Sequence, residues 1–127
     1  MTTLAERAAS ASQEETAGLL EELFLAIHDP RPDRVHGGSQ ALTDWLAKRN
    51  PFHQLLAINT PESLLAAAMM LAGPAACVKT QWHPDLTTKA GVEFYPADDL
   101  EGDGFKGRHK DSLALAMIAA IAQQGGL

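Results

Sequence analysis

Cysteine, aromatic side chains and long apolar runs are all scarce in this sequence of 127 residues. The one cysteine, Cys77, has no second cysteine to pair with, which excludes an intrachain disulfide scaffold. The longest apolar run, residues 113–122, is about half as long as a membrane-spanning helix, so no membrane span is expected. Residues 1–10 have neither a basic start nor an apolar core, so no secretory signal is expected. We therefore expect a cytoplasmic protein.

Alanine and leucine take the place of the missing aromatics. Apolar residues make up 46% of the sequence and aromatic residues only 6%, because 22 residues are alanine and 17 are leucine. Both are strong helix formers. The length suits one domain, and the composition excludes a disordered chain or a collagen-like repeat. A single domain rich in helix follows.

The charge is negative overall but unevenly distributed. The net charge is −6, and residues 1–30 alone carry −5. A protein that binds duplex DNA usually presents a basic surface, so nucleic-acid binding is not expected. The exception is the segment 106–110, hereafter the basic turn, which contains Lys106, Arg108 and Lys110.

Helices are predicted first in the N-terminal half. Thr3 and Ser12 each precede a glutamate by three residues, which is the spacing of a capping box. Leucines in the second helix form one stripe, and a polar loop over residues 29–38 follows. Pro51 is expected to break a third helix. The predicted helices cover residues 4–10, 13–28 and 39–49, the last with Ser39 as its cap and a short continuation over 52–58.

Two further helices are predicted in the C-terminal half. Thr60 and Pro61 are typical of a helix start and Gly73 of a helix end, which predicts a helix over 61–72. The last helix is predicted over 112–124, with Asp111 as its cap. Because it is apolar on nearly all sides, we expect it to lie between the sheet and another helix, or between the subunits of a homodimer.

Short strands are predicted between these two helices, over residues 76–82, 91–95 and 105–108. Cys77 falls in the first strand, where a cysteine is most often a buried small apolar residue. The expected fold is α+β, one compact domain overall. It consists of a helical extension over residues 1–60 and an α-β-β-(β)-α sandwich with a small antiparallel sheet over 61–127.

Several short motifs follow one another in the predicted sandwich. A Ser-Leu helix start precedes the strands, a Gly-Phe-Lys-Gly segment forms the third strand, and an Ala-Leu-Ala helix closes the domain. These motifs occupy residues 62–67, 69–71, 104–107, 112–116 and 118–120. In this order, residues 61–122 resemble the phage ABA-sandwich domain family. The resemblance implies a phage or prophage accessory protein and supplies no catalytic residue.

Three familiar motifs lack the context that their chemistry needs. Gly102, Gly104 and Gly107 spell G-x-G-x-x-G, but acidic neighbours in the same loop would repel a pyrophosphate. The same loop opens like a calcium loop, yet Lys110 stands where a glutamate ligand is required. The tripeptide at 83–85 matches that of J-domain proteins but follows a strand. We interpret all three as turns, and neither a cofactor nor a metal is expected.

The basic turn is the candidate binding site. Lys106, Arg108, His109 and Lys110 immediately precede the last helix, near Ser112. Basic side chains beside the free N–H groups of a helix start can hold an anion. A phosphate, a nucleotide or an acidic partner is therefore one hypothesis, and an ordinary solvated turn is the other.

The function hypotheses belong to different classes. The first is a phage accessory protein that acts without catalysis by binding a host or phage protein, such as a defence effector, in the host cytoplasm. The alternatives are sequestration of an anionic nucleotide or signalling molecule at the basic turn, and a structural role in the virion. No activated nucleophile or acid–base pair is discernible, so an enzyme is not expected.

Overall fold

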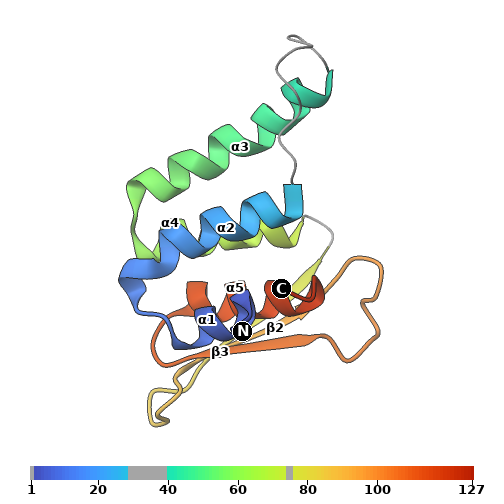
Figure 1. Ribbon diagram of the computed structural model, residues 1–127. Coiled ribbons are helices and arrows are strands. Elements are labelled where there is room, and N and C mark those ends of the chain that lie inside the picture. The colour runs from blue at the N-terminus through green and yellow to red at the C-terminus, as the bar shows by residue number, and fades with distance from the viewer. Residues whose placement is uncertain (1, 29–39, 74–75) are drawn as a thin grey trace.

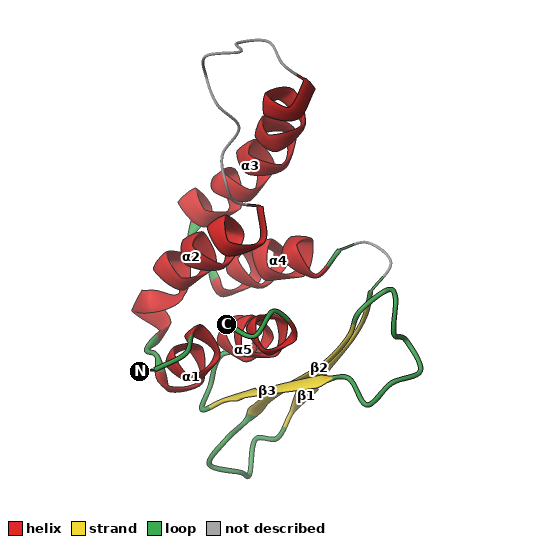
Figure 2. Cartoon of the chain, turned by 45° about the vertical axis from the view of Figure 1, so that its right-hand side comes forward, coloured by secondary structure: helices red, strands yellow, loops and turns green. Residues whose placement is uncertain are grey.

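A computed structural model describes residues 2–28, 40–73 and 76–127. It confirms an α+β fold in which helices stack on one face of a three-stranded antiparallel sheet (Figures 1 and 2). The loop predicted at 29–38 and the cap predicted at Ser39 lie outside the described residues. The elements are α1 (Leu4–Ser10), the 3-10 turn η1 (Gln13–Glu15), α2 (Thr16–His28), α3 (Gln40–Ile58), α4 (Pro61–Ala72), β1 (Cys77–Trp82), β2 (Ala90–Tyr95), β3 (Phe105–His109) and α5 (Leu113–Gln124).

The elements form layers (Figure 2). The strand order is β1-β2-β3, so β2 is central and the other two are edge strands. Helices α1 and α5 lie side by side on the sheet, α2 and α4 lie above them, and α3 is outermost. Thus α1, from the segment expected to be an extension, packs directly on the helix that closes the sandwich.

Helix α5 is the centre of the core. All residues from 114 to 122 are buried. The helix contacts β2 and β3 on one side, α1 beside it, and α2 and α4 above. This confirms that a helix without a polar face is enclosed. Elements of the same chain therefore cover its apolar faces, and the homodimer stays a prediction.

Gly107 permits the close approach of α5 to the sheet. A Cβ atom at this position would meet the backbone carbonyl oxygen of Ala116 and, at 2.8 Å, the backbone nitrogen of Ala120. No side chain larger than hydrogen therefore fits between β3 and this face of α5. The contact aligns β3 under the helix and buries Val92, its partner on β2.

Hydrogen bonds stabilise the position of α1. The Thr3 hydroxyl accepts a hydrogen bond from the backbone N–H of Glu6, as the capping spacing predicts. Arg7 donates two hydrogen bonds to the carboxylate of Glu22 on α2, at 3.0 and 2.7 Å, and this raises the pKa of Arg7. The backbone N–H of Leu4 also donates to the carbonyl of Leu127, so the described ends of the chain lie together.

The predicted break at Pro51 is wrong. Helix α3 continues through this proline to Ile58. An interior proline costs a helix about 3 kcal/mol, because it removes one hydrogen bond and crowds the preceding turn. Packing on both sides of the proline offsets that cost. Trp45 and Phe52 both lie against the ring of Phe24, at centroid distances of 5.8 and 4.8 Å.

The starts of α2 and α5 differ from the predicted ones. Ser12 makes no side-chain capping bond, and a 3-10 turn precedes α2. Ser112 is the cap of α5 in place of Asp111, because its hydroxyl accepts from the N–H of Leu115. The helix over 61–72 is confirmed, with Thr60 and Ser63 exchanging capping bonds at 3.1 and 2.9 Å.

The strands fall within one residue of the predicted limits, and the third strand includes His109.

Candidate binding site

The basic turn does not gather into one site. Side chains alternate along β3, so Lys106 and Arg108 are exposed on the face of the sheet away from α5, whereas Gly107 and His109 are buried beneath it. Lys110 is exposed beyond the strand. The two cations of the strand therefore lie on the opposite face from the start of α5.

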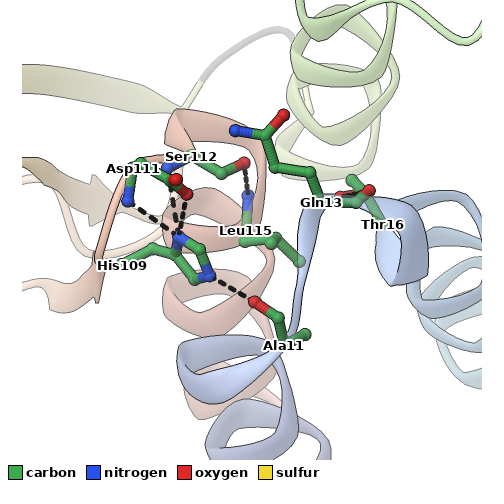
Figure 3. A network of polar contacts seen from close by, with 7 residues as sticks. All are labelled: Ala11, Gln13, Thr16, His109, Asp111, Ser112 and Leu115. Atoms are coloured by element: carbon green, nitrogen blue, oxygen red, sulfur yellow. Dashed lines mark hydrogen bonds and ion pairs between the residues drawn. The ribbon is translucent and has the colours of Figure 1, made fainter.

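His109 is a structural residue. Its side chain is only 4% exposed, and Nε2 lies 2.6 Å from the carbonyl oxygen of Ala11 (Figure 3). Nδ1 accepts hydrogen bonds from the backbone N–H groups of Asp111 and Ser112, at 3.1 and 3.0 Å. Since Nδ1 accepts, Nε2 carries the proton and donates to Ala11. Both ring nitrogens are thus occupied, and His109 is not available to an anion.

A carboxylate lies beside the start of α5 where an anion was expected. Asp111 is exposed and places an oxygen 3.4 Å from Nδ1 of His109 (Figure 3). The Ser112 hydroxyl already satisfies one free N–H of the helix. The helix start therefore has its own negative partner, and the five residues predicted to bind an anion have separate roles.

The outer face of the sheet pairs part of its charges. Tyr95 donates a hydrogen bond to the carboxylate of Glu93 at 3.0 Å, and this bond raises the pKa of Tyr95 above its usual value of 10.0. The ammonium of Lys79 lies 5.5 Å from the centre of the tyrosine ring. In the strand register Glu93 is opposite Lys106. This face is a solvated polar surface with one excess basic pair, Lys106 and Arg108, beside it.

The remaining motifs are structural. Gly104 has φ of +70° and lies against the ring of Tyr95, and Gly107 makes room for α5, so these glycines serve a turn and a contact. Residues 83–89 connect β1 and β2, with the N–H of His83 donating to the carbonyl of Lys89. Among the described residues, no group of three or more His, Cys, Asp or Glu side chains is placed to hold a metal ion.

A cavity of about 440 Å³ opens where three helices begin. The first turn of α4 and the segments that lead into α2 and α5 surround it, and Trp82 closes one side. Its lining residues are Gln13, Glu14, Thr16, Asn59, Pro61, Glu62, Leu64, Leu65, Trp82, Asp111, Ser112, Leu113 and Ala114. We call it the acid-rimmed cavity.

The chemistry of this cavity is apolar inside and negative at the rim. Leucines from α4 and α5 supply most of the apolar wall, while exposed carboxylates of Glu14, Glu62 and Asp111 come from three different segments. None of the described lining residues is Lys or Arg. The cavity therefore suits a group with an apolar body and a positive charge.

Trp82 is the aromatic residue of the cavity wall and is unusually exposed to solvent. About 50% of its surface is exposed, although it is large and apolar. Trp82 ends β1, an edge strand, whereas α5 packs mainly on β2 and β3. Cys77, at the other end of β1, is also exposed but on the outer face, where its partner in the register is Tyr95; this corrects the expectation that it is buried.

Sequence reasoning missed the acid-rimmed cavity because its walls come from four distant segments. The single usable signal was the placement of acidic residues at helix starts, such as Glu62 behind Thr60 and Pro61. That signal predicts each helix separately. It does not predict that the helices begin at the same place, which depends on how α2, α4 and α5 stack.

Comparisons with family models, curated proteins and solved structures find no match to this chain. The resemblance to the phage ABA-sandwich domain family thus stays a prediction. In the part of the chain that the structure describes, no helix has both the length and the apolar character needed to cross a membrane.

Proposed function

We propose that this chain is a non-enzymatic binding module that holds a cationic side chain of a protein partner in the acid-rimmed cavity. The observation that carries the proposal is the combination of three rim carboxylates, an apolar interior and the open indole of Trp82 in one cavity. A lysine or arginine side chain has an apolar stem and a charged end, which matches this order of surfaces.

The physics favours a cation over an anion. A carboxylate accepts charge-assisted hydrogen bonds from an ammonium or guanidinium group, and a tryptophan face attracts the same groups. The positive ends of the surrounding helices already have acidic partners in Glu14, Glu62 and Asp111. A nucleotide phosphate would meet those carboxylates first, so the geometry supports a protein partner better than nucleotide sequestration.

The predicted phage context indicates what kind of protein the partner is. The resemblance to the phage ABA-sandwich domain family implies an accessory protein, whose target is a host or phage protein such as a defence effector. A small acidic domain that contacts a basic segment of such a protein would block it sterically. A structural role in the virion stays a second prediction, and mass spectrometry of purified particles tests it.

Selection of random peptides displayed on particles against the purified chain tests the proposal. We expect enriched peptides to share a lysine or arginine. Their affinity should fall about tenfold or more for Glu62→Lys, which corresponds to roughly 1.4 kcal/mol. Glu101→Lys, an exposed charge reversal outside the cavity, is the matched control and should leave affinity unchanged.

Two outcomes contradict the proposal. One is enrichment of acidic or uncharged peptides. The other is an equal effect of both charge reversals, because a general attraction of basic peptides to a protein of net charge −6 would weaken alike with either variant.

A further inference from the structure

The core covers the inner side of β1 only in part, because Val78 is half-buried against it and the later residues are not. Val78, Thr80 and Trp82 lie on the same side of the sheet as their β2 partners, which the register gives as Phe94, Val92 and Ala90. These β2 residues are buried beneath α5, whereas Thr80 and Trp82 are exposed. Helix α5 packs mainly on β2 and β3 (Figure 2). Thr80 and Trp82 are thus the open part of the inner side of the sheet.

Helix α4 forms the facing wall. Met69 and Met70 are exposed by 47% and 42%, and with Val78 they line a second hollow of about 650 Å³. The start of α4 meets Trp82 at the acid-rimmed cavity, while its end meets the beginning of β1 at the second hollow. Helix and strand therefore run in opposite directions, with one hollow at each end of the pair. We call the space between α4 and β1 that joins these two hollows the β1–α4 cleft.

The outer edge of β1 is free to pair. A strand inside a sheet forms backbone hydrogen bonds with a neighbour on each side, but β1 has only β2 beside it. No described residue outside the sheet makes a backbone hydrogen bond to residues 77–82. Alternate N–H and C=O groups of this strand therefore face away from the sheet, as in domains that bind an extended peptide by adding a strand.

We propose that an extended segment of the partner pairs with β1 as a fourth strand. Its alternate apolar side chains enter the β1–α4 cleft, and a lysine or arginine at one end enters the acid-rimmed cavity. Val78 to Trp82 spans about 13 Å, which accommodates four to five extended residues. Met69 and Met70 have flexible side chains that adjust to different apolar partners.

The charge of the cleft selects this occupant. The acid-rimmed cavity at its end attracts a cationic segment, whereas a second copy of this chain brings a net charge of −6 to the same place. A β1–β1 pair would also leave the cavity without a cation. A basic extended segment satisfies the backbone edge, the apolar groove and the rim together.

The inference rests on the proposed function and is tested with designed probes. These are capped hexapeptides of alternating valine and threonine with one arginine, placed at either end to allow both strand directions. We expect one of them to bind, and we expect alternate backbone N-methylation to weaken it at least tenfold, because methylation removes the paired N–H groups. Amide hydrogen exchange in residues 77–82 should slow when the unmethylated peptide is bound.

Variants of the cleft supply the control. Met69→Glu should weaken the peptide about tenfold or more by placing a charge in the groove. Leu100→Glu, which changes a similarly exposed leucine that lines neither hollow, should not. Both positions are exposed, so both variants should fold.

The possible failures are separable. Equal affinity of the methylated peptide, or unchanged exchange in β1, overturns strand addition and leaves the cavity proposal standing. Equal affinity after replacement of the arginine by glutamine overturns the cavity proposal and leaves strand addition standing. A dimer of the free chain with β1 already protected means that a second copy fills the cleft, and no binding at millimolar peptide shows that strand addition is absent; each overturns the inference.

Discussion

The two edge strands of the sheet have opposite surroundings. At β3, α5 touches the backbone through Gly107, and the buried His109 bonds across to Ala11. At β1, the inner side is open at Thr80 and Trp82, and Cys77 is exposed on the outer side. The strands have similar lengths and the same antiparallel neighbour, β2. Their difference comes from the position of α5 and α1, which both pack on β3.

We expect β3 to contribute to the stability of the fold and β1 to contribute to binding. Contacts at β3 are close and involve backbone atoms, so substitutions there change the free energy of unfolding. Contacts at β1 are few and open, so substitutions there leave the fold intact and change what the surface binds. The following predictions test that separation, from the largest expected effect to the smallest.

Gly107→Ala should destabilise the protein by about 3 kcal/mol or more, because the added methyl group meets the backbone of α5 and not a movable side chain. Chemical denaturation measures it. Gly91→Ala on β2 is the control: its new Cβ would find its nearest neighbour at 3.7 Å, an ordinary contact, so the free energy of unfolding should change by less than about 0.5 kcal/mol. Equal effects of the two variants would contradict the close contact at β3.

His109→Ala should cost about 2–3 kcal/mol of unfolding free energy. It leaves the carbonyl of Ala11 and the N–H groups of Asp111 and Ser112 without their present partner. Denaturation midpoints measure the loss, and His83→Ala, an exposed histidine in the β1–β2 turn, should change little. A loss below about 0.5 kcal/mol for His109→Ala would show that the network is not structural.

Trp82→Ala should lower the free energy of unfolding by less than about 1 kcal/mol, since half of the side chain is already in solvent. The same variant should abolish binding of the arginine-containing hexapeptide, which calorimetry measures. A large loss of stability would place Trp82 in the core, against the contrast between the two edges.

Glu93→Gln should lower the pKa of Tyr95 toward 10.0, because the carboxylate that stabilises the protonated phenol is lost. Tyr95 is the single tyrosine of the chain, so the ultraviolet absorbance of tyrosinate reports it directly. In the native protein this bond contributes stability below pH 10, and the contribution is lost as the pH rises through the raised pKa of Tyr95. An unchanged titration curve in the variant would contradict the bond.

Local signals in the sequence were sufficient for the elements and their order. Thr60 with Pro61, and Gly73 at the other end, fix α4 through backbone chemistry that needs no distant partner. The apolar pattern of residues 113–122 likewise requires an enclosed helix. The break predicted at Pro51 is wrong because tertiary contacts offset the local cost of a proline inside a helix. These contacts are the packing of Trp45 and Phe52 on Phe24.

The site depends on which residues lie close together in space, and the sequence does not show this directly. His109 reads as part of a basic cluster, yet its partner is Ala11, which lies 98 positions earlier in the chain. The sequence predicts Cys77 as a buried strand residue, yet it lies on the outer face of an edge strand and is exposed. The acid-rimmed cavity needs three helix starts in one place, so no single motif predicts it.

Native-state amide hydrogen exchange of the free chain tests the central contrast most directly. We expect the amides of residues 105–109 that bond to β2, and those in the middle of α5, to exchange only through global unfolding, whereas the amides of residues 77–82 that bond to β2 also exchange through local opening. Equal protection of β1 and β3 would contradict the claim that one edge of this sheet is closed by the core and the other is open for a partner.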